Sequence, residues 1–470
     1  MAERRFHLGI DYGTSTSKLV FRDYGAPGGE KAFVVVEGET FRIPSTVAVV
    51  SDRLVFGSPA LSLAEDSRGT LYDSVKMRVA EEASNGGKKF HYGAKPDFPN
   101  GFRARELAIL TVWWLISSGH RAIQHRLADS GGGDPIIGMT LGIPMSFVSE
   151  RVIREEFLII AKTAWRLFRR EGPMPEDLNL TDSRSLIDKS VDEEVSDMTN
   201  EEIRDWVRSE SEAAMWWAFR SPSVSDGPFA QIDVGAGTTN ASLFRICSKF
   251  ENGQWVKTNM GFFHSCSEPL GMDAVDDLIQ KNLPISVQRP RSIRGIEDHY
   301  IDTYGLQPTV CAFVTDEIRK SYKKSWTRTY QDKIMNSVAE CDAWRDHRVL
   351  LVGGGNLIKA VRSGIPFHPS GGGKPPLQVQ QLEMPGDLFL AKVISKPSLL
   401  ERAVRTILRS GNGQFTQRPA SSDLPFLSVA YGLSNIGIAV PEIVTPDQMP
   451  VMVASIQRRE RLTHDDIYAK

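Results

Sequence analysis

The chain has 470 residues, of which 41% are hydrophobic and 24% charged, so it is long and apolar enough to form two or more domains with a large core. Lysine and arginine number 56 against 58 acidic residues, and the net charge of -2 gives no general attraction to nucleic acid or anionic lipid. No apolar run approaches the ~20 residues of a membrane span. Four cysteines without a CxxC pair indicate neither a zinc site nor a disulfide framework. We therefore expect a cytoplasmic protein without a membrane span that recognises its partners locally.

Strands and helices are expected to alternate along the chain, which predicts an α/β fold. The first strand-turn-strand, LGIDYGTSTSKLVF, covers residues 8–21, and the segment FRIPSTVAVV then alternates like a strand. Apolar periodicity predicts helices near residues 105–128, 150–169 and 200–219. Three segments are expected to be exposed loops because of their Gly, Pro or acidic residues, namely 83–100, 172–200 and 368–376.

The opening pattern returns in the second half of the chain. QIDVGAGTTNASLF, residues 231–244, again places an Asp and small Gly-rich residues between two apolar runs. The remaining expected elements are helices near 273–280 and 315–340, a buried strand that begins VLLVGGG at 349–355, and a last helix from Leu427. Because short-period repeats are absent, this long repeat predicts two related lobes that face each other across a cleft.

The repeated loops have the composition of phosphate-binding loops. Glycine lets the main chain approach a phosphate closely, and small hydroxyl side chains add hydrogen-bond donors without bulk. One such loop has the same letters as an ordinary β-hairpin turn, so a single copy does not distinguish the two. The second copy favours phosphate binding, and so does VLLVGGGNLIKAV, which places a glycine run between a buried strand and a helix. Asp11 and Asp233 would then hold hydrated Mg²⁺, which takes only one or two carboxylates and keeps several waters.

These three segments, in this order, resemble the phosphate-one, phosphate-two and adenosine motifs of the superfamily of actin, sugar kinases and DnaK-type heat-shock ATPases. Further segments resemble the ATPase domain of heat shock protein 70 family chaperones, namely IPSTVAVVSDRLVFGSPA, YDSVKMRV, GIPMSFVSERV, SESEAAMWWAF, PLGMDAVDDL, DEIRKSYKK and VAYGLS. The resemblance covers most of residues 8–439. It implies a two-lobed actin-like ATPase fold, with duplicated ribonuclease H-like lobes around a nucleotide cleft.

The resemblance also implies domain boundaries. Lobe I would cover residues 1–225, with a core subdomain of 1–42 and 105–225 and a peripheral subdomain of 43–104. Lobe II would cover residues 226–445, with a core subdomain of 226–266 and 346–445 and a peripheral subdomain of 267–345. A C-terminal tail, 446–470, would follow.

A site for ATP or ADP with Mg²⁺ follows from the same resemblance. Asp11 and Asp233 would hold the waters of the metal, and Asp233 would help to activate the attacking water. Lys76 would reach the γ-phosphate and offset its negative charge, while Glu210 would orient the water. Solvated surface charges are the alternative reading of Lys76 and Glu210.

The nucleotide-binding residues implied by the resemblance come from both halves of the chain. Those expected to cradle the phosphates are Gly13, Thr14 and Ser15 from one lobe and Gly235, Gly237 and Thr238 from the other. Glu317 and Lys320 lie one helical turn apart and would contact ribose and adenine, above Gly353 and Gly354. An exposed helix pair is the alternative for Glu317 and Lys320.

Several positions depart from the family pattern. Asn240 stands where the family has a second carboxylate, which predicts slow turnover because a neutral amide cannot act as a base. Gly355 and Leu357 replace a Ser and an Arg of the adenosine motif, so the stacking of Arg on adenine is lost. Phe426 stands where the family has an acid. Pro144 and Arg151 resemble the pair that carries a signal from the nucleotide to the lobe surface, and a strand-ending proline and a surface arginine are the alternative.

The sequence therefore predicts a Mg-ATP-binding, slowly hydrolysing, chaperone-like ATPase switch that signals to a protein partner. About thirty residues follow VAYGLSNIGIAV, so we expect this chain to lack a peptide-binding domain of its own. A filament-forming actin-like ATPase is one alternative, which ATP-dependent light scattering would identify. A small-molecule kinase is another, and it would place phosphate on an acceptor.

Overall fold

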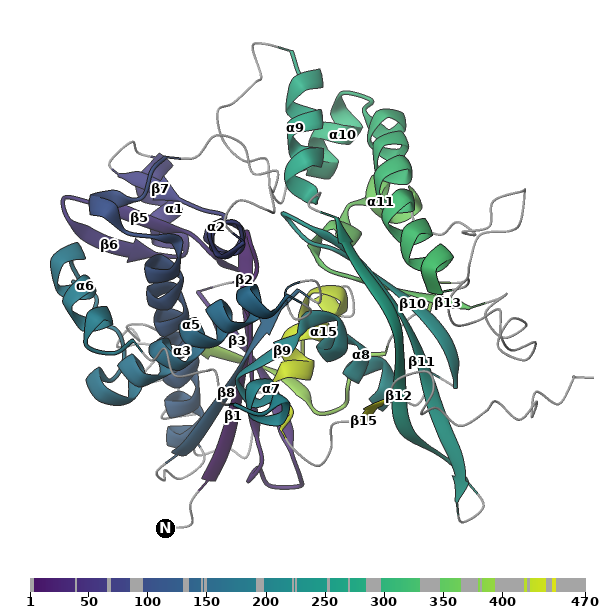
Figure 1. Cartoon of the computed structure of the whole chain (residues 1–470), viewed down its shortest axis with the longest axis horizontal. Coiled ribbons are helices and arrows are strands. Elements are labelled where there is room, and N and C mark those ends of the chain that lie inside the picture. Colours follow the sequence, from purple (N-terminus) through teal and green to yellow (C-terminus); the bar gives the residue numbers. More distant parts are fainter. Residues whose placement is uncertain are drawn as a thin grey trace, which may run out of the picture.

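A computed structural model describes residues 4–38, 40–65, 69–84, 96–129, 135–144, 147, 150–191, 198–221, 224, 226–251, 254–268, 271–284, 297–329, 347–364, 379–380, 383–393, 418–420, 423–436 and 442–444. Parts of some predicted segments lie outside these residues, namely 85–95, 330–340, 368–376 and the tail 446–470. The described residues form a mixed α/β structure with two large sheets, which confirms the predicted class (Figure 1).

The two large sheets repeat one strand arrangement. In each, three successive strands form an antiparallel meander, and a later strand pairs in parallel with the first strand of that meander. The seven-stranded sheet contains β1 (Arg4–Asp11), β2 (Thr16–Asp23), β3 (Lys31–Glu37), β4 (Ile43–Pro44), β8 (Pro135–Ile143), β9 (Val207–Ser209) and β14 (Leu388–Val393). The five-stranded sheet contains β10 (Gly227–Val234), β11 (Thr239–Glu251), β12 (Gln254–Glu268), β13 (Arg348–Val352) and β15 (Glu442–Val444). The repeat predicted from the two sequence patterns is therefore present in the strand pairing.

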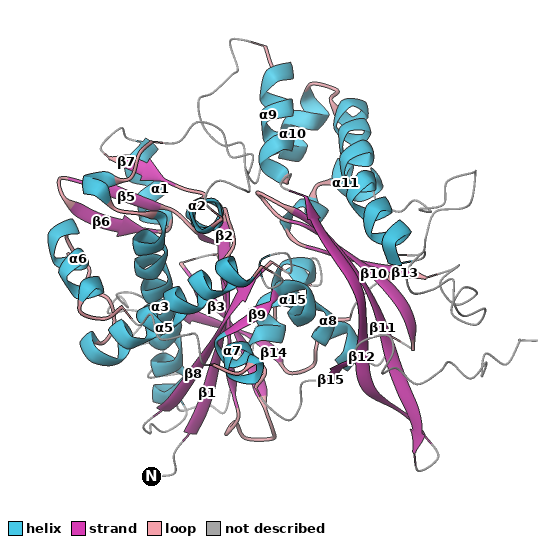
Figure 2. Ribbon diagram, in the orientation of Figure 1, coloured by secondary structure: helices cyan, strands magenta, loops and turns pink. Residues whose placement is uncertain are grey.

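A third, smaller antiparallel sheet and the helices complete the structure (Figure 2). The small sheet has the order β6 (Arg53–Phe56), β5 (Val47–Val50) and β7 (Thr70–Tyr72). The helices that precede β10 are α1 (Ser58–Glu65), α2 (Val75–Ala83), α3 (Ala104–Asp129), α5 (Arg151–Glu171), α6 (Leu180–Asp188), α7 (Asn200–Trp206) and α8 (Glu210–Arg220), with a 3₁₀ turn η1 (Pro99–Gly101). Those that follow are α9 (Met272–Asn282), α10 (Glu297–Thr303), α11 (Gln307–Thr329), α13 (Lys359–Gly364) and α15 (Leu424–Leu433), with the 3₁₀ turn η3 (Gly354–Leu357).

Helices α8 and α15 join the two large sheets. They pack against each other, and α15 contacts β1 and β2 of one sheet and β13 of the other. Figure 1 shows both helices between the sheets. Trp217 of α8 is fully buried against Tyr431 of α15, with ring centroids 5.2 Å apart. This aromatic contact lies within the helix pair that touches both large sheets.

Two predictions about the first half of the chain are wrong. The expected helix 200–219 is interrupted by β9, because Val207, Arg208 and Ser209 pair in parallel with β8. The segment 172–200 is not simply an exposed loop, since it contains α6 and the buried side chains of Leu178, Leu180 and Ile187. Apolar side chains spaced through an acidic segment anchor it on the core, where burial of each is worth about 2 kcal/mol.

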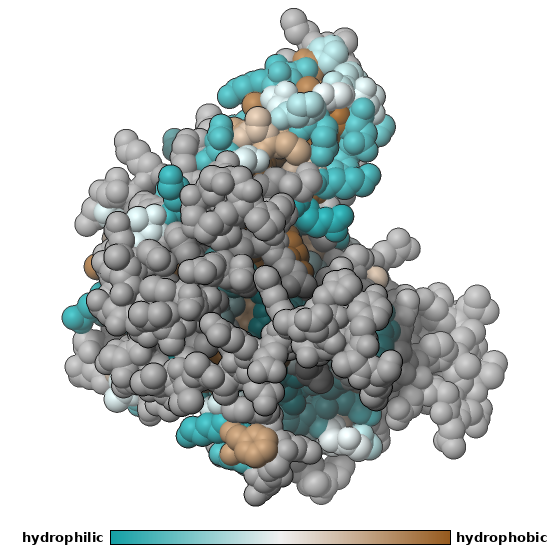
Figure 3. Space-filling model, turned by 90° about the vertical axis from the view of Figure 1, so that its right-hand side faces the viewer, coloured by the Kyte–Doolittle hydropathy of each residue, from teal (hydrophilic) through white to brown (hydrophobic). Residues whose placement is uncertain are grey.

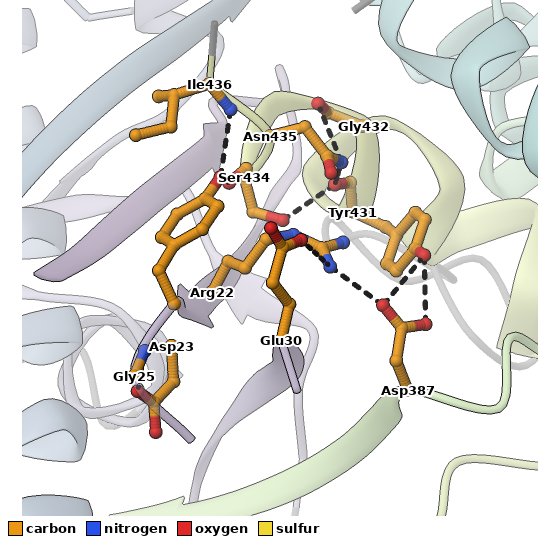
Figure 4. A network of polar contacts seen from close by, with 11 residues as sticks. Arg22, Asp23, Gly25, Glu30, Asp387, Tyr431, Gly432, Ser434, Asn435 and Ile436 are labelled. Carbon is orange, nitrogen blue, oxygen red and sulfur yellow. Dashed lines mark hydrogen bonds and ion pairs between the residues drawn. The ribbon is translucent and has the colours of Figure 1, made fainter. Parts of the chain in front are cut away.

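A buried arginine ties β2 to α15. Arg22 is fully buried, and its Nη1 donates to Asp387 Oδ2 at 2.7 Å (Figure 4). The Tyr431 hydroxyl donates to the same carboxylate at 3.0 Å, and the guanidinium lies 5.0 Å from the centroid of the Tyr431 ring. Among the described residues, Arg22 Nε and Nη2 have no hydrogen-bond acceptor. The charge of Arg22 therefore depends mainly on Asp387.

His7 in β1 makes folding stability depend on pH. Burial, and then the nearby Arg208 and Arg22, lower the pKa of His7 from 6.5 to about 3. The unfolded chain takes up a proton on this residue below pH 6.5 whereas the folded chain does not until about pH 3. Stability is therefore lost as the pH falls through this window, by up to about 1.4 kcal/mol per pH unit.

We expect His7→Gln to remove this acid sensitivity while the new amide donates to Thr140 Oγ1, which His7 Nε2 contacts at 2.9 Å. Urea unfolding of both proteins at pH 7.5, 6, 5 and 4 gives their free energies of unfolding, and the difference between the two proteins at each pH is the contribution of His7. A difference that does not change with pH would contradict the assignment of a neutral, buried imidazole.

Few large apolar side chains are exposed on the described part of the structure. They are Ile136, Val152, Phe250, Val256, Val379 and Ile436. Figure 3 shows small hydrophobic patches among hydrophilic residues on one face. None of the described helices combines the length and apolar character needed to cross a membrane.

Candidate functional site

A cavity of about 500 Å³ is lined by residues from both large sheets and from the loops at their strand ends. Its size lies within the range of roughly 300–1,000 Å³ that is usual for ligand pockets. Most of the residues that the sequence predicted for a site line it, namely Asp11, Gly13, Thr14, Ser15, Lys76, Glu210, Asp233, Gly235, Thr238, Gly353 and Gly354. Segments far apart in the sequence are therefore brought to one place.

Asp11 and Asp233 occupy equivalent positions in the two strand arrangements. Each lies at the end of the first strand of its meander, and each faces the second strand across an antiparallel pair. Asp11 is opposite Lys18, whose Nζ contacts Asp11 Oδ2 at 3.0 Å, whereas Asp233 is opposite Asn240. The first carboxylate has a cationic partner, and the second faces a neutral amide.

The loops that follow these strands are shaped by close backbone contacts. In the first loop, residues 12–15, a Cβ at Gly13 would lie 2.1 Å from the Thr16 carbonyl oxygen, so only glycine fits. In the second loop, residues 235–238, the Gly235 N–H donates to the Thr238 carbonyl at 2.9 Å. A Cβ at Gly237 would approach Met77 of α2 at 3.0 Å. Gly237 does not belong to the cavity lining and instead lets the second loop pack on α2.

Lys76 and Glu210 form a buried ion pair in the cavity wall. Their side chains are 3% and 10% exposed, and Lys76 Nζ contacts Glu210 Oε1 directly. Lys76 lies in the first turn of α2, and Glu210 is the first residue of α8. Ser209 caps the N-terminus of α8, because its side-chain oxygen accepts a hydrogen bond from the Glu212 N–H at 3.3 Å. The alternative reading, in which both are solvated surface charges, is wrong.

The cavity concentrates negative charge. Burial raises the pKa of Glu210, the neighbouring Asp11 raises it further, and Lys76 opposes both effects. Burial, then Glu210 and Asp11, raise the pKa of Asp233 to about 7. Asp11, Glu210 and Asp233 thus share the cavity lining with Lys18 and Lys76, and additional positive charge beside these carboxylates would stabilise them.

The oxygen atoms of the cavity suit a hard divalent cation. Asn240 Oδ1 is buried and has no hydrogen-bond partner among the described residues, and Asn240 lines the same cavity as Asp11 and as Asp233, its cross-strand neighbour. No group of three or more His, Cys, Asp or Glu side chains within the described ranges could hold a metal by itself. Mg²⁺ does not need such a group, because it takes one or two carboxylates and completes its shell with waters and phosphate oxygens.

A glycine run closes another wall of the cavity. Gly353 has φ of 83° and ψ of 164°, a conformation that L side chains rarely adopt, and a Cβ there would lie 2.1 Å from Asp233 Oδ1. Gly354 packs against the Phe426 ring, which a Cβ would approach at 2.8 Å. A side chain at Gly353 would therefore displace the Asp233 carboxylate.

We expect Gly353→Ala to lower the free energy of unfolding by about 3 kcal/mol, since backbone strain of about 1–3 kcal/mol adds to the clash with Asp233. Gly172→Ala is the matched control, because Gly172 has φ of 79° and ψ of -158° but no atom within 4 Å of its would-be Cβ. Urea unfolding compares the two variants. Equal losses would show that the approach to Asp233 has no energetic consequence.

Some of the residues predicted for the site or its signalling path are not among the described residues that line the cavity. The backbones of Glu317 and Lys320 belong to α11, and the side chains of both lie outside the described part of the structure. The same holds for the side chain of Leu357. Pro144 lines the cavity, whereas the Arg151 side chain is 72% exposed and pairs with Glu155 at 2.7 Å.

Several cavity residues were not predicted. The sequence did contain an indication for Lys18, because a lysine within the apolar run of a buried strand needs a partner of opposite charge. Arg42 had none, because its position depends on the pairing of β4 with β2. The other unpredicted polar residues of the lining are Thr16, Glu297, Asp298 and His299.

Comparison of the sequence with models of known protein families gave no match. A search of curated proteins likewise found no significant similarity.

Proposed function

We propose that the chain is a slowly hydrolysing Mg-ATPase switch with a two-lobed actin-like fold, similar to the ATPase domain of the heat shock protein 70 family. One observation carries the proposal: Asp11 and Asp233, from equivalent positions of two repeated strand arrangements, meet in one cavity with the buried Lys76–Glu210 pair. In this proposal the lobes comprise residues 1–225 and 226–445, with the boundaries between core and peripheral subdomains expected above.

The loops at the strand ends bind the nucleotide. Backbone N–H groups and hydroxyls of the first and second loops bind the phosphates of ATP or ADP, with Thr14 and Thr238 among the donors. Gly353 and Gly354 lie under the base, where the absence of side chains lets a planar group approach the backbone. Loops of small residues at two strand ends support this assignment.

Asp11, Asp233 and Asn240 are the residues that would hold Mg²⁺, through its waters. When bound, Mg²⁺ offsets the charge of the phosphates and that of the carboxylate cluster. The all-oxygen donor set supports this choice of metal, and so does Asn240 Oδ1, which has no hydrogen-bond partner in the part of the chain that the structure describes.

Hydrolysis uses charges that the cavity already contains. Lys76 stabilises the negative charge that develops on the transferred phosphoryl group, and Glu210 orients the attacking water. Asp233, which faces the neutral Asn240 and not a cation, accepts a proton from that water. Asn240 supplies no second base, which is why turnover is slow.

A path to a protein partner begins at the end of β8. Pro144 lines the cavity, and α5 begins at Arg151, which is exposed on the surface. A change of the cavity on nucleotide binding would move the start of α5 and alter the surface that a partner contacts. The surface at the start of α5 would then differ between the ATP-bound and the ADP-bound protein.

Phosphate release from Mg-ATP tests this function. The unsubstituted protein is expected to release free phosphate slowly, only with Mg²⁺, and Asp233→Asn to remove the activity. Asp188→Asn, an exposed carboxylate of α6, is the control and should change nothing. Phosphate found on an acceptor instead would indicate a kinase, and ATP-dependent light scattering would indicate a filament.

A further inference from the structure

Arg42 lies beside Lys18 at the cavity wall. Strand β4 pairs antiparallel with the start of β2, with Thr16 opposite Pro44 and Ser17 opposite Ile43. Continuing this register places Arg42 opposite Lys18. Both residues line the cavity, so the fold sets two cations side by side at its edge.

The two cations share one aromatic ring. The Arg42 guanidinium carbon lies 4.1 Å from the centroid of the Phe426 ring, and Lys18 Nζ lies 5.7 Å from the same centroid. A guanidinium over a ring is held by cation–π attraction while its edge remains available to hydrogen-bond acceptors. Phe426 therefore fixes Arg42 in place without using its N–H donors.

Lys18 has a carboxylate partner, whereas Arg42 has no carboxylate at ion-pair distance among the described residues. Lys18 has Asp11 at 3.0 Å, whereas the Arg42 guanidinium has no hydrogen bond or ion pair with any residue of the described ranges. Asp423 and Glu297 act on Arg42 only at longer range, and burial outweighs both and lowers its pKa. Two adjacent cations, one without a close counter-ion, favour an anion beside them.

We propose that Arg42, stacked on Phe426, binds a phosphate oxygen of the nucleotide and so provides a third cation of the site besides Lys18 and Lys76. This inference rests on the proposed function. A phosphate suits this position better than a base, because the guanidinium fork matches phosphate oxygens and a neutral base would leave the charge of Arg42 without a close counter-ion. The position of the first loop, between β2 and the end of β1, puts phosphate-binding groups close to Lys18.

Calorimetric titrations with Mg-ATP and with adenosine test the inference. Arg42→Gln is expected to weaken Mg-ATP binding about 10- to 100-fold, the loss usual for a charge-assisted hydrogen bond, and to leave adenosine binding unchanged. Arg42→Lys should recover only part of the affinity, because it restores the charge but not the fork. Phe426→Leu should weaken Mg-ATP binding less than Arg42→Gln does, since it frees Arg42 without removing it.

Arg169→Gln, at an exposed position of α5, is the matched control and should bind both ligands like the unsubstituted protein. Equal Mg-ATP affinities of Arg42→Gln and the unsubstituted protein would overturn the inference and leave the proposed function standing. Equal losses for Mg-ATP and adenosine would also overturn it, because the role of Arg42 would then not concern phosphate. Absence of Mg-ATP binding to the unsubstituted protein would overturn the proposed function as well.

Discussion

Replacing Lys76 by methionine is expected to lower the rate of phosphate release by about 100-fold or more, the usual effect of removing one group that stabilises transition-state charge. Methionine keeps most of the side-chain volume, so the cavity wall remains filled. Lys76 is 3% exposed and pairs with Glu210 inside the cavity, where solvent does not replace the lost charge. Phosphate release at saturating Mg-ATP measures the effect, and Lys189→Met on the exposed end of α6 is the control.

The same substitution is expected to destabilise the fold by about 3–5 kcal/mol, because it leaves Glu210 buried without its partner beside Asp11. Adding Glu210→Gln should recover most of this stability, since the amide carries no charge. Phosphate release should remain low in the double variant. Full recovery of both stability and phosphate release would show that the pair is structural only.

Replacing Asp387 by alanine is expected to lower the free energy of unfolding by about 3–5 kcal/mol. Arg22 is fully buried, and its ion pair with Asp387 at 2.7 Å is its closest compensation for desolvation. Without Asp387, the buried guanidinium keeps only Glu30, a half-exposed carboxylate 3.7 Å from Arg22 Nη1, and Tyr431 loses the acceptor of its hydroxyl. The helix that carries Phe426 should loosen together with this contact.

An exposed ion pair provides the comparison. Lys359 and Asp302 lie 3.7 Å apart with side chains that are 66% and 61% exposed, so Asp302→Ala should cost less than about 1 kcal/mol. Urea unfolding of both variants at pH 7 gives the two values. If both variants lost similar amounts of unfolding free energy, groups other than Asp387 would compensate the desolvation of the Arg22 charge.

The parts of the site encoded locally were predictable from the sequence. Asp11 is the last residue of its strand and Asp233 the second-last of its own, each before a loop of small residues, and Gly353 follows a buried strand, so the residue order alone indicates where they lie. The strand repeat was predicted for the same reason. These features depend on neighbours within about ten positions of the chain, and periodicity detects such neighbours well.

The features that depend on distant pairing were not predictable in this way. Arg42 reaches the cavity because β4 pairs with β2, and it is held by Phe426 from the other end of the chain. Likewise β9 interrupts a helical pattern because three residues pair with β8. Local propensity does not contain such contacts, and tertiary pairing overrides it where the two disagree.

Calorimetric titration of Mg-ATP into the purified chain tests the central claim most directly, with the Asp11→Asn/Asp233→Asn double variant beside it. We predict saturable binding at one site that requires Mg²⁺ and is at least about tenfold weaker in the double variant, a difference of about 1.4 kcal/mol. No binding to the unsubstituted chain, or equal affinity in the double variant, would contradict the assignment of this cavity to Mg-ATP.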